Sequence, residues 1–206
     1  MPATPPVPGD AVSSVENASP QRRALAFAAG IVALDQFTKG LALAILAPEV
    51  LWKITDLVAL LDTRVTPNRP IFPFFNLALI TNKGAAWGMF KDTDFAPIAL
   101  TALAAIASIV LALVLARPKT DLSPHQRTAL AVILGGIVGN LIDRLRFGAV
   151  VDFLDIHLGG WHWPAFNVAD SAICVGVFLY LLASFRADST TEKGPEKSSV
   201  TPTTGK

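Results

Sequence analysis

Charge is scarce in this chain. Only 16% of its 206 residues are charged, whereas a soluble domain usually carries about 25%. The missing charge is concentrated in a few long stretches, a pattern that indicates membrane spans rather than a soluble fold. The formal net charge of +1 excludes the strongly basic surface on which nucleic-acid binding normally depends. We therefore expect membrane lipids, and no nucleic acid, among the partners.

Cysteine is almost absent as well. Cys174 is the only one, which excludes an internal disulfide and a metal site built from several cysteines. It lies within an apolar run, where we expect it to act as a small buried hydrophobic residue. What the chain has in abundance is hydrophobic residues, which make up 52% of it and give a mean hydropathy of +0.50.

Four apolar stretches are each long enough to cross a bilayer as a helix. They cover residues 24–47, 95–116, 128–145 and 168–185. The first continues into further apolar sequence without a small-residue cleavage site, so we interpret it as an uncleaved span rather than a signal peptide. The two ends of the chain are polar, lack an apolar period and are expected to be disordered. The domain organisation is therefore a disordered segment over 1–21, a membrane domain over 22–186 and a disordered tail over 187–206.

Four spans place both termini on the same side of the membrane. Nine cationic residues lie on the side of the termini: Arg22, Arg23, Arg117, Lys119, Arg127, Arg186, Lys193, Lys197 and Lys206. Seven lie on the other side: Lys53, Arg64, Arg69, Lys83, Lys91, Arg144 and Arg146. The positive-inside rule thus favours cytoplasmic termini and an external segment over residues 48–94.

Part of this external segment is strand-prone. Residues 76–81 are rich in residues that favour strands, and Asn82-Lys83-Gly84 follows them as a turn signal. The expected fold class is an all-α membrane protein, in which a bundle of four transmembrane helices carries a small external β-sheet.

Polar side chains within spans are costly and favour a functional interpretation. Asp35 and Lys39 lie four residues apart on one helix face and are expected to form an ion pair. The alternative is that they act directly on the substrate or shape the architecture of the site. Asn140, Asp143 and Arg144 share one face of the third span and together would form a charge-balanced polar node.

Glycines precede this node. Gly135 and Gly139 form a small-xxx-small pair, which lets a neighbouring helix approach closely.

Two further carboxylates follow the third span. Asp152 comes in a short connection, and Asp170 lies in the first turn of the fourth span, so both reach the same edge of the bilayer if the connection folds back. Two carboxylates at close range share one proton. One then activates a water while the other protonates a scissile carbonyl, which is the chemistry of an aspartic peptidase.

A metal site is the alternative for this region. The residues of suitable type are Asp152, Asp155, His157, His162 and Asp170. No His-Glu-x-x-His motif occurs, and the spacing of Asp155 and His157 matches no metal site for which a mechanism can be argued. We therefore expect no metal and no cofactor. We interpret His157 and His162, beside Trp161 and Trp163, as interfacial residues near the lipid headgroups.

Five motifs together resemble the lipoprotein signal peptidases, or signal peptidase II. They are Asp35 with Lys39, Asn-Lys-Gly-Ala-Ala-Trp-Gly at 82–88, Gly-Gly-x-x-Gly-Asn-x-x-Asp-Arg at 135–144, Val-Val-Asp-Phe at 150–153, and Phe-Asn-x-Ala-Asp at 166–170. They occur in the order of the family and cover residues 24–186. The chain departs from the family in a longer connection over residues 48–75.

The resemblance implies a membrane-embedded aspartic endopeptidase of the bacterial inner membrane, with its site at the periplasmic face. The catalytic pair would be Asp152 and Asp170. Other matched positions would bind substrate or brace the site: Asp35, Lys39, Asn82, Gly84, Asn140, Asp143, Arg144 and Asn167. The implied substrate is a prolipoprotein with a diacylglyceryl-modified cysteine, cut just before that cysteine. A monomer is expected.

Other functional classes remain as alternatives. A small proton-coupled transporter or channel would use Asp35, Lys39, Asp143 and Asp170 as a relay, but most of these residues lie near span ends and no inverted repeat is evident. A non-catalytic assembly factor would leave Asp152 and Asp170 unexplained. A presenilin-type protease is disfavoured because its Gly-x-Gly-Asp signature is absent.

Overall fold

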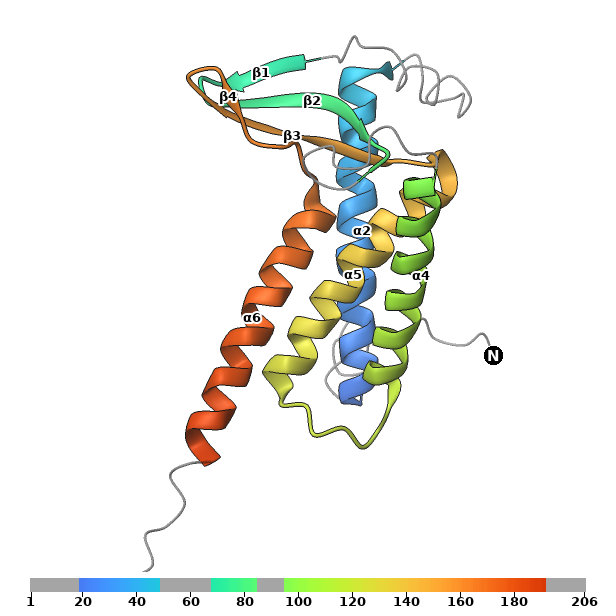
Figure 1. The fold of residues 1–206 in the computed structure, drawn as a ribbon, viewed down its shortest axis with the longest axis vertical. Coiled ribbons are helices and arrows are strands. Elements are labelled where there is room, and N and C mark those ends of the chain that lie inside the picture. The colour runs from blue at the N-terminus through green and yellow to red at the C-terminus, as the bar shows by residue number, and fades with distance from the viewer. Residues whose placement is uncertain (1–18, 49–67, 85–94, 192–206) are drawn as a thin grey trace, which may run out of the picture.

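The computed structural model describes residues 19–48, 68–84 and 95–191 and consists of a helical layer with a sheet at one end (Figure 1). The four long helices are α2 (Pro20–Leu46), α4 (Phe95–Ala116), α5 (Pro124–Phe147) and α6 (Val168–Thr191). All four are long and apolar enough to cross a membrane. The predicted four-span bundle is thereby confirmed.

Helices α2 and α5 begin a few residues before their apolar stretches because polar side chains cap them. Ser19 accepts a hydrogen bond from the backbone N–H of Arg22, so α2 begins at Pro20. Ser123 and Gln126 form a reciprocal capping box at the start of α5. Gly148, at φ 71°, ends α5 in the left-handed conformation that glycine adopts without strain.

The two segments expected to be disordered lie mostly outside the described residues. Within the described part, residues 20–21 continue into α2 and residues 187–191 continue α6. Residues 49–67, the greater part of the long connection, also lie outside it.

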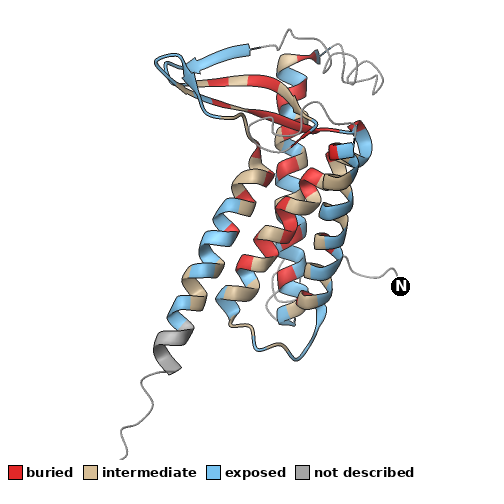
Figure 2. Ribbon diagram, viewed as in Figure 1, coloured by how far each residue is buried: buried red, intermediate tan, exposed pale blue. Residues whose placement is uncertain are grey.

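Helix α5 is the centre of the bundle, and Figure 2 shows its buried residues facing the other helices. Two glycines allow this close packing. A Cβ on Gly135 would lie 2.6 Å from the Ile31 Cβ of α2, and one on Gly136 would lie 2.5 Å from the Ala169 backbone oxygen of α6. Both distances are shorter than real contacts, so larger residues would push the helices apart. The expected packing role of glycines in this span is thus confirmed at Gly135.

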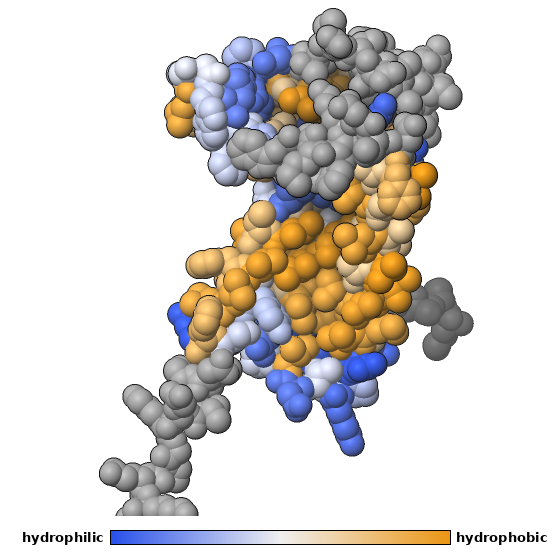
Figure 3. Space-filling view, in the orientation of Figure 1, coloured by the Kyte–Doolittle hydropathy of each residue, from blue (hydrophilic) through white to orange (hydrophobic). Residues whose placement is uncertain are grey.

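The outer surfaces of α4 and α6 are apolar and exposed, for example at Leu103 and Phe178. Figure 3 shows this surface as an apolar belt between polar ends, which is the surface that a bilayer covers. Cys174 lies on the exposed surface of α6, so the prediction that it is a buried core residue was wrong. In a membrane span, the apolar environment of such a residue is lipid rather than the protein core.

The sheet is antiparallel with strand order β1-β2-β3-β4. Its strands are β1 (Asn68–Phe72), β2 (Phe75–Asn82), β3 (Val150–Leu158) and β4 (Trp161–His162). Strand β2 covers the predicted 76–81, but β3 lies in what the sequence suggested was a plain connection after the third span. The nine-residue β3 pairs with β2 from Asn82↔Val150 to Phe75↔Ile156, and this pairing joins segments about seventy residues apart in the sequence.

The sheet packs on the end of the bundle where α2 and α5 end and α6 begins (Figure 1). Val151 is fully buried there against Leu43, Ala47, Leu79 and Phe147. The opposite end of the bundle carries the start of α2 and the end of α6. Strand β3 therefore brings its first residues directly over the polar ends of the helices.

Candidate active site

A capping box places Asp170 at the start of α6. The side chain of Asn167 accepts a hydrogen bond from the Asp170 backbone N–H (2.9 Å), and Asp170 Oδ2 accepts one from the Asn167 backbone N–H (3.2 Å). This reciprocal pair satisfies two donors that the helix cannot pair internally. The carboxylate also lies where the partial positive charge of the helix N-terminus favours an anion.

Strand β3 places Asp152 beside this helix start. Its side chain is only 2% exposed. Asn167 Nδ2 donates to Asp152 Oδ1 at 2.7 Å, and Asn82 Nδ2 of β2 donates to Asp152 Oδ2 at 3.3 Å. Asn82 in turn is held by a turn, because its Oδ1 accepts the Gly84 backbone N–H at 3.1 Å.

Two asparagines connect the two aspartates. Asn167 contacts both, as just described, and its Nδ2 also donates to Asn140 Oδ1 at 3.1 Å. Asn140 Nδ2 donates to Asp170 Oδ1 at 2.8 Å. An amide carries both a donor and an acceptor, so this pair can tie two acidic side chains together without adding charge.

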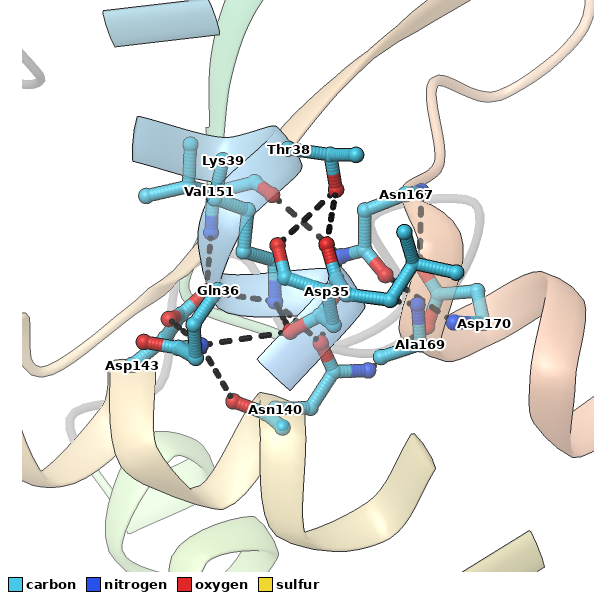
Figure 4. A network of polar contacts seen from close by, with 12 residues as sticks. Asp35, Gln36, Thr38, Lys39, Asn140, Asp143, Val151, Asn167, Ala169 and Asp170 are labelled. Atoms are coloured by element: carbon cyan, nitrogen blue, oxygen red, sulfur yellow. Dashed lines mark hydrogen bonds and ion pairs between the residues drawn. The ribbon is translucent and has the colours of Figure 1, made fainter. Parts of the chain in front are cut away.

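Beside the asparagines lies a buried ionic node made of Asp35, Lys39 and Asp143 (Figure 4). Lys39 Nζ lies 2.9 Å from Asp35 Oδ2, 2.8 Å from Asp143 Oδ2 and 3.0 Å from Asn140 Oδ1. The expected Asp35–Lys39 ion pair is present. The charge of Asp143, however, is balanced by Lys39 of α2 and not by the adjacent Arg144. One ammonium against two carboxylates leaves the node with one net negative charge.

Each carboxylate of the node also accepts a backbone hydrogen bond from the residue that directly precedes Asp170 or Asp152. Asp35 Oδ1 accepts the backbone N–H of Ala169 (2.9 Å), the neighbour of Asp170. Asp143 Oδ2 accepts the backbone N–H of Val151 (3.1 Å), the neighbour of Asp152. The node thus ties the start of α6 and the start of β3 to α2 and α5, so its geometry sets the relative position of Asp152 and Asp170.

Burial dominates the electrostatics of Asp152. Together with the negative charge of Asp170, it raises the pKa of Asp152 to about 8, although hydrogen bonds from Asn82 and Asn167 and the charge of Lys39 act in the opposite direction. An ordinary aspartate has a pKa of about 4. Asp152 therefore keeps its proton at neutral pH while Asp170 carries the negative charge that raises the Asp152 pKa.

Arg144 lies half-buried on α5 within electrostatic range of Asp170, Asp152 and Asp143. Its guanidinium makes no hydrogen bond to another residue in the described part of the chain, which leaves its donors available beside the two aspartates.

Of the five residues considered for a metal site, Asp155, His157 and His162 form a separate polar cluster on the sheet, whereas Asp152 and Asp170 belong to the site described above. Asp155 accepts hydrogen bonds from Asn76 Nδ2 at 2.9 Å and contacts His162 Nδ1 at 2.8 Å. Burial raises the pKa of Asp155, but these contacts and the nearby histidines outweigh it and hold the pKa below its usual value. His157 stacks on His162 with ring centroids 5.1 Å apart. Among the described residues, no three His, Cys, Asp or Glu side chains group as metal ligands.

One member of the site was missed by the sequence analysis. Gln36 Nε2 donates to Asp143 Oδ1 at 3.0 Å, to Asp35 Oδ2 at 3.2 Å and to the Gly139 backbone oxygen at 3.2 Å. The signal was available, because a polar amide in an apolar span is costly unless it is hydrogen-bonded.

Comparisons with known proteins identify the family. The family model described as signal peptidase (SPase) II matches residues 27–186, which include every residue of the site. The chain belongs to the signal peptidase II family. The predicted resemblance is thereby confirmed, and the transporter alternative receives no support from the relatives.

Individual relatives carry the same family name, and a solved structure of a bacterial membrane enzyme has a similar fold. The lipoprotein signal peptidase of Oleidesulfovibrio alaskensis is 40% identical over 159 residues, which cover 77% of this chain and 92% of the relative. That of Syntrophotalea carbinolica is 44% identical over 156 residues, covering 76% and 86%. A bacterial membrane enzyme solved by the in meso method at 2.3 Å has a TM-score of 0.62 and 25% identity, covering 85% of this chain and 94% of that one.

Proposed function

We propose that Asp152 and Asp170 are the catalytic pair with which this signal peptidase II removes signal peptides from prolipoproteins. The observation that carries the proposal is their placement. The two carboxyl groups come from different elements and meet at Asn167, and burial together with the Asp170 charge raises the pKa of Asp152 to about 8, so that Asp152 keeps its proton at neutral pH. An acid and a base side by side are what peptide hydrolysis by a water molecule requires.

The roles follow from the protonation states. Asp170 takes a proton from a water molecule as the water oxygen attacks the scissile carbonyl carbon, and Asp152 gives its proton to the carbonyl oxygen. The tetrahedral gem-diol then collapses. Asp170 returns its proton to the leaving nitrogen as the C–N bond breaks, and Asp152 takes a proton from a gem-diol hydroxyl. Both residues end in their starting states, so the cycle needs no further reactant.

A lipid-bearing substrate suits the position of this pair. Asp170 lies in the first turn of α6 and Asp152 lies beside it through Asn167, and α6 begins at the sheet end of the bundle, where the apolar belt ends (Figures 1 and 3). The acyl chains of a diacylglyceryl-modified cysteine can therefore stay in hydrocarbon while the peptide bond reaches the site. Moving such chains into water would cost about 0.8 kcal/mol per methylene. Cleavage just before the modified cysteine is the specificity that membership of the family implies, and we include it in the proposal.

The proposed location is the bacterial inner membrane, with the sheet and the catalytic pair in the periplasm. Both described ends of the chain, at Pro20 and Thr191, lie at the end of the bundle opposite to the sheet. The modest excess of cationic residues on that side supports cytoplasmic termini. Reporter fusions at Lys206 and near Arg69 test this orientation, and a periplasmic signal from the Lys206 fusion would contradict it.

The catalytic assignment is tested by single substitutions with a matched control. Asp152→Asn and Asp170→Asn should each abolish cleavage of a diacylglyceryl-modified peptide, since an amide can neither accept the proton of water nor return one. Asp155→Asn is the control, because it removes a buried carboxyl from the same strand as Asp152 and should retain activity. Substantial turnover by either folded dyad variant would remove that residue from the mechanism. Equal cleavage of an unlipidated peptide would contradict the proposed substrate.

A further inference from the structure

We infer that Gln36 is a positioning residue for catalysis, because its side-chain amide fixes the distance between Asp35 and Asp143 and thereby the relative position of Asp152 and Asp170. The inference rests on the proposed dyad and extends it to a residue of α2 that contacts neither member of the pair.

The first step is the number of donors in the node. Lys39 Nζ has three N–H bonds, and one each is directed to Asp35 Oδ2, Asp143 Oδ2 and Asn140 Oδ1. No donor of Lys39 remains for the second oxygen of Asp143. Within the described residues, that oxygen receives a hydrogen bond from Gln36 alone.

The second step is the bridging geometry. The same Nε2 atom reaches Asp143 Oδ1 at 3.0 Å and Asp35 Oδ2 at 3.2 Å, so Gln36 joins two carboxylates that repel each other. The Gln36 Oε1 atom accepts from Arg146 Nη1 at 3.5 Å, which orients the amide with its nitrogen toward the node. Gln36 is therefore a neutral bridge between Asp35 and Asp143, beside the charged bridge that Lys39 forms between the same two carboxylates.

The third step connects the bridge that Gln36 forms between Asp35 and Asp143 to the catalytic pair. Asp35 holds the Ala169 N–H and Asp143 holds the Val151 N–H. When the two carboxylates separate, the backbone on which Asp170 stands moves with one, and the backbone on which Asp152 stands moves with the other. A displacement on the order of 1 Å in a catalytic group can cost about 10²-fold in rate.

The experiment compares Gln36→Met with Gln36→Glu on a diacylglyceryl-modified peptide. The first change keeps the length of the side chain and removes its donors. It should lower kcat by roughly 10- to 100-fold with little change in KM, since the residue does not contact the substrate. Wider separation of the pair weakens the effect of the Asp170 charge on Asp152, so the alkaline limb of kcat/KM should also move to lower pH.

Gln36→Glu gives the sharper readout. When ionised, the new carboxylate adds a second net negative charge to the node. When protonated, it restores one of the lost donors at the same position while leaving an oxygen for Arg146. Its activity should therefore recover toward that of the wild type as the pH falls, and Gln36→Met should show no such recovery. The charged groups that contact Gln36 are Asp35, Asp143 and Arg146, and Lys39 pairs with both carboxylates. Arg144, Asp152 and Asp170 are the other charged groups of the site.

Gln126→Met is the matched control. Gln126 also joins two helices by an amide hydrogen bond, to Ser184 Oγ at 3.1 Å, but it lies at the opposite end of the bundle. Its loss should lower stability with kcat unchanged. A Gln36→Met protein within about twofold of the wild-type kcat, or a Gln36→Glu profile parallel to that of Gln36→Met, overturns the inference. If Asp152→Asn or Asp170→Asn remains active, the dyad assignment itself fails instead. If Gln36→Met does not fold, the inference is tested by whether the activity of Gln36→Glu rises toward that of the wild type as the pH falls.

Discussion

Lys39→Met should be among the most destabilising single substitutions in this protein. The Lys39 side chain is 4% exposed and its partners Asp35 and Asp143 are 0% and 2% exposed. Removing one partner of a buried ion pair costs about 3–5 kcal/mol because a charge is left without compensation. Here one cation compensates two carboxylates, so the loss should reach the upper part of that range. The net charge of the node would change from −1 to −2 in a nearly dry environment.

The charge count also predicts how the damage can be reversed. Asp35→Asn combined with Lys39→Met returns the net charge of the node to −1, so the double variant should regain part of the lost stability. At about 2–4 °C per kcal/mol for a protein of this size, the single variant should unfold roughly 10–20 °C below the wild type, and the double variant should lie between them. Thermal unfolding in one detergent measures all four proteins. A double variant no better than the worse single one would refute the reasoning.

Two further predictions concern activity. Asp143→Asn should lower the turnover of lipidated substrate but leave measurable residual activity. The amide oxygen can still accept the Val151 N–H, while the ion pair with Lys39 is lost. Complete inactivity of a well-folded variant would require a new assignment of the catalytic pair. The kcat/KM of the wild type should fall about tenfold per pH unit above pH ~8, as Asp152 loses its single proton. A profile that stays flat to pH 10 would contradict the role of Asp152 as the acid, and a substrate without titratable groups excludes substrate ionisation as the cause.

Much of the helical architecture was predictable because the bilayer imposes a simple pattern. A span must be long, apolar and internally hydrogen-bonded, and the stretch over residues 95–116 coincides with α4. The ion pair of Asp35 with Lys39 was predictable for a similar reason, since a helix places residues four apart on one face. Both inferences depend only on local sequence.

The rest depended on contacts between distant segments. Strand β3 could not be distinguished from a connection, because Asp152, Asp155 and His157 interrupt its apolar residues and the segment becomes a strand only through pairing with β2. The partner of Asp143 was predicted to be Arg144, its neighbour in sequence, whereas Lys39 of another helix takes that place. Gln36 escaped notice because an amide has no charge, although it contacts both carboxylates of the node.

The burial that prepares Asp152 for catalysis also lowers the stability of the protein. The folded-state pKa of Asp152 is about 8, against about 4 in an unfolded chain, so the folded state binds the proton more tightly. The stabilising effect of that proton is complete below pH ~4 and is lost as the pH rises through about 8. At neutral pH much of this stabilising effect is already lost. A carboxyl group that served only to stabilise the fold would not be buried at this position. The hydrogen bond from the Val151 N–H to Asp143 does not involve the Asp152 carboxyl, so it holds the backbone next to Asp152 in both protonation states. The protein thus separates the two tasks: Asp35, Lys39 and Asp143 hold the backbone in place, and Asp152 and Asp170 remain free to exchange protons.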